Sequence, residues 1–163
     1  MAFQSINELE QFRYDDCVIG EMKVEDAQIK MIVDALIVGR NNSQNSNFTE
    51  SYADTASVRL VGGTILSAVK DGYKYYDAND VLLNEVPDTP LDGEAIDAFP
   101  KLCEGAYMYS VDKEADVDGK SCYTFGFEFV DEEESAMGDS YRLTIAFERA
   151  IVSWERDLNR VQS

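Results

Sequence analysis

The chain has 163 residues, of which 45% are hydrophobic and 11% aromatic, as expected for a folded protein of about one domain. It contains no histidine, which excludes Ser-His-Asp and Cys-His catalysis and histidine-ligated metal sites. The 32 acidic and 14 basic residues give a net charge of −18, which argues against direct binding to nucleic acid.

The sequence predicts a cytoplasmic protein without membrane contact. No apolar run approaches the roughly 18 residues that span a bilayer, and the start of the chain lacks the basic and apolar regions of a signal peptide. Cys17, Cys103 and Cys122 are widely spaced and form no Cys-x-x-Cys pair, so we expect reduced, buried thiols.

The N-terminal segment is predicted to begin with a helix and to continue as strands. Ser5-x-x-Glu8 is a capping-box pattern, and the apolar residues that follow at helical spacing predict a short helix over 6–13. Residues 17–24 and 28–38 then have the alternation of strands, the second of them buried on much of both faces.

The middle of the chain is predicted to be rich in strands and turns. Asparagine and serine side chains over 39–47 favour a polar loop, interpreted as a mobile connector rather than a functional loop. Hairpin turns are predicted at 25–27 and 77–80, and Pro87 and Pro90 end the strand that follows the second turn. The further strands are predicted at 52–60, 64–70, 73–76, 81–86, 106–111, 121–130 and 141–147.

Two further helices are predicted. Asp92 is a suitable N-cap for a helix that Pro100 kinks or interrupts and Gly105 ends. Beyond Phe147 the apolar residues also fall at helical spacing, which favours a C-terminal helix; a long strand through Trp154 is the alternative.

Strands and helices do not alternate along the chain, which disfavours a parallel α/β sheet. We therefore predict a single domain over residues 1–163, of class α+β and mainly β. Its expected architecture is a curled antiparallel sheet, either a barrel or a sandwich, of about eight strands with two or three short helices.

The negative charge is concentrated in one part of the chain. Residues 77–140 hold 18 acidic and 3 basic side chains, and the densest run is Asp131-Glu-Glu-Glu134. Such a run is typical of a solvated loop that keeps a protein in solution. The alternative is a surface that attracts a basic partner, and this interpretation gains if residues 77–140 fold onto one side of the molecule.

The candidate metal motif has a simpler explanation. Glu114-Ala-Asp116-Val-Asp118-Gly119 resembles the start of a calcium loop, but position twelve, where a bidentate Glu is required, is Phe125. An Asp-Gly hairpin turn accounts for the same residues. The cysteines lack a histidine partner, so we assign no catalytic, cofactor-binding or metal-ligating residue and expect no cofactor.

Tyrosines form the most distinctive pattern of the sequence. The candidate ligand or partner surface consists of Tyr73, Tyr75, Tyr107, Tyr109, Tyr123, Asp131, Glu132 and Glu133. Core packing explains tyrosines in strands, whereas an amphipathic cleft or a partner-binding face would use their apolar body and polar tip.

Three segments carry a resemblance to a known group of proteins. They are Tyr14-Asp-Asp-Cys17, Asn41-Asn-Ser-Gln-Asn45 with Ser51-Tyr-Ala53, and Gly72-Tyr-Lys-Tyr-Tyr-Asp77. These segments resemble a family of small uncharacterised proteins of anaerobic Gram-positive bacteria, over most of residues 10–130. The resemblance implies a cytoplasmic bacterial protein and brings no activity, ligand or catalytic residue.

Three functional hypotheses follow. The first is a non-enzymatic acidic protein-interaction module, an immunity or inhibitor role included, whose partner is a basic protein. The alternative is a small-ligand-binding β-barrel or sandwich with an aromatic-lined pocket. An enzyme that uses carboxylates or a metal is the third and is disfavoured, because most catalytic constellations need histidine or a recognisable loop. Homodimerisation through an edge strand or the last apolar stripe is a further hypothesis.

Overall fold

The chain is mostly antiparallel β-structure, as the sequence predicted. The computed structural model describes residues 3–25, 27–45, 49–130 and 137–160, which form sixteen strands, one α-helix and one turn of 3-10 helix. The elements are β1 (Phe3–Ile6), η1 (Leu9–Gln11), β2 (Phe12–Arg13), β3 (Val18–Glu25), β4 (Gln28–Asp34), β5 (Ile37–Val38), β6 (Ser51–Ala53), β7 (Ala56–Val61), β8 (Thr64–Lys70), β9 (Tyr73–Tyr76), β10 (Leu82–Val86), β11 (Thr89–Pro90), α1 (Gly93–Leu102), β12 (Tyr107–Val117), β13 (Lys120–Val130), β14 (Met137–Phe147), β15 (Arg149–Trp154) and β16 (Asp157–Arg160).

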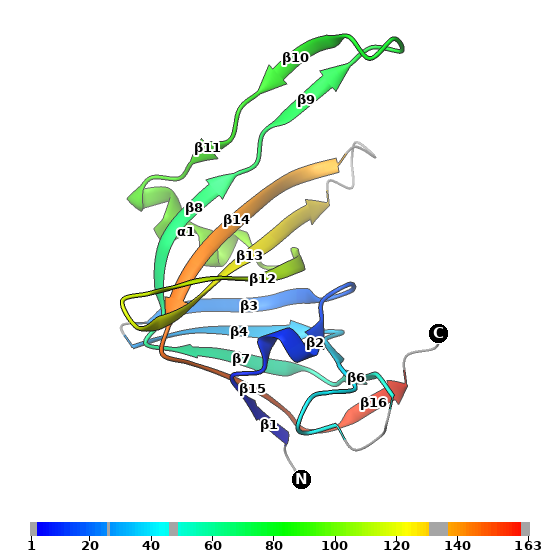
Figure 1. Ribbon diagram of the computed structural model, residues 1–163, viewed down its shortest axis with the longest axis vertical. Helices are drawn as coiled ribbons and strands as arrows, with labels where there is room; N and C mark the ends of the chain where they lie inside the picture. The colour runs from blue at the N-terminus through cyan, green and yellow to red at the C-terminus, as the bar shows by residue number, and fades with distance from the viewer. Residues whose placement is uncertain (1–2, 26, 46–48, 131–136, 161–163) are drawn as a thin grey trace.

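Ten strands form one large curled sheet (Figure 1). Their order is β1-β15-β7-β4-β3-β12-β13-β14-β8-β11, and every pairing is antiparallel. Strands β16, β6, β5 and β2 form a second, smaller sheet, and β9 and β10 form a separate pair. The predicted curl is present, but the sheet is open, and its ten strands are more numerous than the predicted eight.

A shared corner produces the curl. β7 continues into β8 through Gly62 and Gly63, and β14 continues into β15 through Glu148, so the same two chain segments pair on both sides of the bend. The Glu148 N–H donates to the Val61 carbonyl at 2.8 Å, and Gly62 has a φ of 70°. A Cβ at Gly63 would lie 2.9 Å from the Leu60 carbonyl oxygen, so this corner requires glycine.

The hydrophobic core lies between the two halves of the bent sheet. Alternation places Ile29, Met31 and Val33 of β4 inward, as predicted, and all three are fully buried. Phe125 and Phe127, which alternate along β13, are equally buried, so their face of this strand is a core face.

Helix α1 packs against this core. The Asp92 carboxylate accepts a hydrogen bond from the Ala95 N–H at 2.8 Å, which confirms the predicted N-cap. Phe99 is fully buried, and its ring lies edge-on to Phe127 and Tyr141 with centroid distances of 5.4 and 5.5 Å. Of the two alternatives predicted for Pro100, a kink or an interruption, the interruption is wrong, because α1 continues to Leu102 with Pro100 inside it.

The two terminal helix predictions are wrong. Residues 3–6 pair with β15 instead, and only Leu9–Gln11 are helical. The tail forms strands β15 and β16, which confirms the alternative of a strand through Trp154. In both segments pairing with a distant part of the chain outweighs a local helical pattern. The predicted turn at 25–27 includes Asp26, which lies outside the described residues.

Glu8 anchors the described part of the polar loop, residues 39–45, to the N-terminal segment. Its carboxylate accepts hydrogen bonds from the Ser43 N–H at 2.9 Å, from the Ser5 hydroxyl at 2.8 Å and from the Ser43 hydroxyl. Burial raises the pKa of the Glu8 carboxyl, but these three hydrogen bonds together lower the pKa by more, so it lies below its ordinary value.

This arrangement predicts a pH-dependent stability. A carboxyl whose pKa is lower in the folded chain stabilises the fold above its unfolded pKa, and this contribution is lost as the pH falls through the folded pKa. We expect Glu8→Gln to lower the free energy of unfolding by about 1 kcal/mol at pH 7 and by less below about pH 4. Urea denaturation at both pH values measures this, and an equal loss at both would contradict it.

Candidate interaction surface

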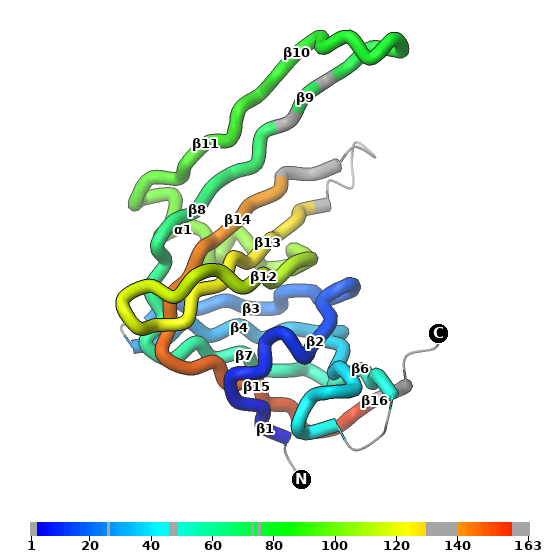
Figure 2. Tube along the Cα trace, in the orientation of Figure 1, coloured from blue at the N-terminus to red at the C-terminus, as the bar shows by residue number. Residues whose placement is uncertain are grey.

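Strands β9 and β10 form a hairpin arm that projects from the main sheet (Figure 2). The predicted turn at 77–80 is confirmed. The Asp77 carboxylate accepts hydrogen bonds from the N–H groups of Asn79 at 2.8 Å and Val81 at 3.0 Å, and the Asp77 N–H donates to the Val81 carbonyl at 2.9 Å. Asp80 adopts a φ of 62°, which aspartate tolerates in tight turns. The arm is therefore a closed, ordered hairpin.

The base of the arm is a close approach of two chain segments. A Cβ at Gly72 would lie 1.9 Å from the Val86 carbonyl oxygen and 2.5 Å from the Pro87 carbonyl carbon, so only glycine fits at this position. The Gly72 N–H donates to the Asp88 carboxylate at 2.7 Å. This junction separates β8 from β9 and β11 from β10.

A polar network ties the arm base to the sheet. Arg142 of β14 lies between two carboxylates: its Nε is 2.5 Å from Asp71 and its Nη2 is 3.0 Å from Asp88. The Ser140 hydroxyl donates to Asp71 at 2.9 Å and lies 3.1 Å from the Tyr109 hydroxyl. The hydrogen bond with Asp71 raises the pKa of Arg142, so the guanidinium stays charged. The network therefore positions the arm in one direction.

The end of the arm carries a cluster of exposed apolar side chains, which we call the apolar tip. Its members are between 45% and 66% exposed: Tyr76, Val81, Leu82 and Leu83. An isolated two-stranded hairpin is marginally stable in water, and a contiguous exposed apolar surface is typical of a binding site. The apolar tip therefore makes the arm the candidate interaction surface.

The structure brings some of the predicted site residues to the arm. Tyr73 and Tyr75 lie on β9, and Tyr109 joins the network at the arm base. Tyr107 is exposed on β12. The acidic residues Asp131, Glu132 and Glu133 lie outside the described residues.

Tyr123 belongs to the core instead. Its ring is buried and stacks on Phe147 with a centroid distance of 5.6 Å, and its hydroxyl donates to Glu10 at 3.0 Å. Burial, together with Glu10, raises the pKa of Tyr123 to about 12. Core packing, the first interpretation of the tyrosines, holds for this one.

The apolar tip was not predicted from the sequence. Residues 81–86 were predicted as an ordinary strand, yet Val81, Leu82 and Leu83 are consecutive apolar residues without alternation. A short hairpin bounded by Gly72 and Pro87 has few neighbours that could bury them. The apolar run and the short hairpin together were the sequence signal from which this exposed cluster could have been predicted.

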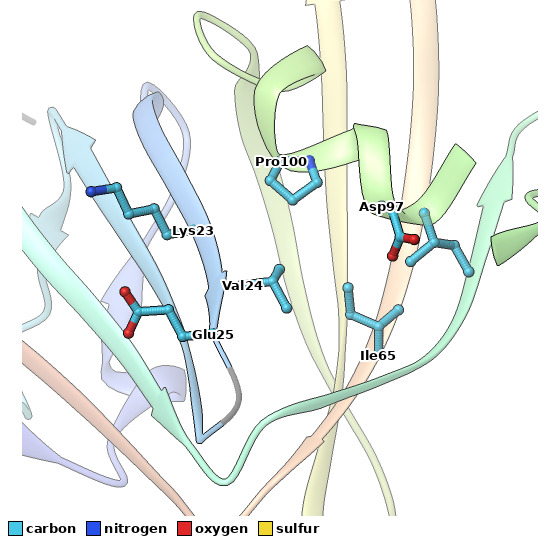
Figure 3. Close-up of a pocket in the computed structure, with 7 residues that line it drawn as sticks. Lys23, Val24, Glu25, Ile65, Asp97 and Pro100 are labelled. Atoms are coloured by element: carbon cyan, nitrogen blue, oxygen red, sulfur yellow. The ribbon is translucent and has the colours of Figure 1, made fainter. Parts of the chain in front are cut away.

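Two hollows lie elsewhere on the described surface. One, of about 390 Å³, lies between β3, β8 and α1, with Val24, Ile65 and Pro100 on its walls and charged side chains around them (Figure 3). The other, of about 470 Å³, is lined by residues that include Asp34, Tyr52 and Arg156. Neither is lined by the predicted tyrosines, so their chemistry differs from that of an aromatic-lined pocket.

The three thiols are buried, and the acidic motif includes a turn between two strands. Burial raises the pKa of Cys17 and Cys103 to about 12 and raises the pKa of Cys122, so all three stay protonated and weakly nucleophilic at neutral pH. Asp118 and Gly119, with φ values of 49° and 78°, form the turn between β12 and β13. Among the described residues, no group of Cys, Asp and Glu side chains is arranged to hold a metal ion.

Compared with known proteins, the chain matches no family model, no curated protein and no solved structure. In the part of the chain that the structure describes, no helix is long and apolar enough to cross a bilayer.

Proposed function

We propose that the protein is a non-enzymatic, acidic protein-interaction module of the cytoplasm, and that the β9–β10 arm is its docking element. The observation that supports this proposal is the apolar tip at the end of a projecting hairpin. The Arg142 network holds the hairpin in one direction before any partner is bound, which reduces the entropy that binding would cost.

The charge of the surrounding surface supports the same role. The described residues between 64 and 147 hold 15 acidic and 6 basic side chains, and they include the arm, α1 and strands β12 to β14. An apolar patch surrounded by charged residues has the composition of a protein interface. Like-signed charge around it accelerates association with a partner of opposite sign.

Site-specific crosslinking tests the proposal. A photo-crosslinking amino acid replaces Leu83 at the apolar tip or, as a control, Leu66, which is also exposed but lies on β8. Both full-length variants are irradiated in lysate of the cells that carry the protein. We expect a discrete adduct with another protein from position 83 and none from position 66.

The adduct then has to be reproduced with purified components. Binding of the identified protein to Leu82→Ser and Leu83→Ser variants is expected to be about tenfold weaker than to the unmodified chain. Absence of an adduct at position 83, or the same adducts from both positions, would contradict the proposed function.

A further inference from the structure

The two long edges of the arm differ in how they are protected against pairing. On β10 a bulge interrupts the register between Leu82 and Asn84, and Pro87 and Pro90 follow, which lack N–H donors. Bulges and prolines on an edge prevent the addition of a further strand. The four residues of β9, Tyr73 to Tyr76, contain neither a bulge nor a proline.

The free edge of β9 presents hydrogen-bonding groups. The Asp77 N–H donates to Val81 across the hairpin, and successive N–H groups of a strand alternate between its two edges. The N–H groups of Lys74 and Tyr76 therefore lie on the edge away from β10. Among the described strands β9 pairs with β10 alone, so no other strand of the described part of the chain occupies this edge.

The position of this edge relative to the sheet leaves it accessible. Pairing between β8 and β14 ends at Lys70 and Tyr141, followed by one hydrogen bond from the Asp71 N–H to the Ser140 carbonyl at 2.8 Å. Beyond that point the arm diverges from β14 (Figure 1).

The charges of the arm favour a basic partner. Residues 71–91 contain five acidic side chains and one basic one, a net charge of −4. Lys74 is the single cation among these residues, and it lies 3.7 Å from the Glu85 carboxylate of β10. Its charge therefore does not prevent strand pairing at the free edge of β9. A second copy of this chain would bring another arm of the same sign and a further net charge of −18, which opposes self-pairing.

We infer that the arm accepts an extended, basic segment of a partner protein as an additional strand on the free edge of β9. The partner's backbone pairs with the N–H groups of Lys74 and Tyr76, its apolar side chains contact the apolar tip, and its cations face the arm carboxylates. This inference rests on the proposed function, since it specifies what docks on the arm and how.

A defined peptide tests the inference with the full-length chain. The probe is a short fluorescent peptide of alternating lysine and valine, and its counterpart alternates glutamate and valine; binding is read by anisotropy. Lys74→Pro removes one N–H from the free edge and leaves the ladder with β10, whereas Lys74→Ala removes the charged side chain beyond Cβ and keeps the N–H. Circular dichroism confirms that each variant is folded.

The charge requirement has its own matched pair of variants. Asp80→Asn neutralises a carboxylate in the arm turn, and Asp118→Asn neutralises one in the β12–β13 turn; both positions have a positive φ, which asparagine tolerates. We expect the lysine peptide to bind about tenfold more weakly to Lys74→Pro, and about as well to Lys74→Ala and Asp118→Asn as to the unmodified chain. Asp80→Asn should weaken the binding of the lysine peptide severalfold, and the glutamate peptide should not bind to the unmodified chain.

Several results would overturn the inference. Equal binding to Lys74→Pro would show attraction by charge without strand pairing, and equal effects of Asp80→Asn and Asp118→Asn would show that the arm is not the site. Dimerisation in light scattering that Lys74→Pro abolishes would identify a second copy as the occupant. If crosslinking at position 83 succeeds while the peptide does not bind, the proposed function stands and this mode of docking is wrong.

Discussion

Replacement of Phe99 by alanine is expected to lower the free energy of unfolding by about 3–5 kcal/mol, the largest effect of any single substitution in α1. Phe99 is fully buried, and its ring lies edge-on to both Phe127 and Tyr141. Truncation removes buried apolar surface and leaves a cavity, because the surrounding strands are held by their own pairing and relax only in part.

Chemical denaturation of the variant and the unmodified chain measures this loss. Leu102→Ala is the matched control, since Leu102 lies on the same helix but is exposed, and we expect it to change the stability by less than about 0.5 kcal/mol. Equal effects of the two substitutions would show that α1 does not contribute to the core through Phe99.

Helix α1 also connects the two halves of the bent sheet. Apart from the corner at which β7 continues into β8 and β14 into β15, the two halves of the bent sheet meet between β12 and β3, where Tyr107 and Val18 form the one registered pair. Helix α1 packs on β3 while Phe99 contacts β13 and β14, so the helix connects the halves where strand pairing is sparse. Loss of Phe99 weakens that connection as well as the core.

Much of this fold could be predicted from local patterns. Alternation in β4 and β13 identified core faces because a strand buried on one side imposes a period of two on its side chains. The Asp77 turn and the Asp92 N-cap were predictable because each depends on hydrogen bonds to N–H groups within four residues. Alternation, turns and N-caps can be recognised in the sequence because each depends on residues that are close together along the chain.

The errors concern segments whose structure depends on distant partners. Ala150, Ile151 and Trp154 form part of a helical stripe in the sequence, yet β15 is a strand because it pairs with β7 and β1. The Ala150 N–H donates to the Asn7 side chain, 143 positions away, at 2.9 Å. A pairing between such distant residues leaves no local pattern in the sequence. For this reason the helix predictions were wrong at both ends of the chain.

The candidate site was predictable only in part. The tyrosines of β9 were noted as a pattern, but the projection of the arm follows from the close approach of Gly72 to Val86 and from the Arg142 network. Both join residues that are distant in sequence. The apolar tip becomes recognisable as a surface only once its exposure is known.

Replacement of Gly72 by alanine is expected to separate β9 from β10 at the arm base while the main sheet stays intact. A Cβ 1.9 Å from the Val86 carbonyl oxygen and 2.5 Å from the Pro87 carbonyl carbon displaces backbone, which cannot rotate away as a side chain would. We expect faster amide hydrogen exchange throughout residues 73–86, and about tenfold weaker binding of any partner that the arm holds.

Gly93→Ala is the control for this substitution. A Cβ at Gly93 meets no atom within 4 Å, and alanine favours the helix that begins there, so exchange in the arm should not change. Because Gly72 lies outside β8 and β11, protection of the main sheet should also be retained. Slow exchange in the arm of Gly72→Ala would contradict the close approach, whereas faster exchange with undiminished partner binding would show that docking does not require an ordered arm.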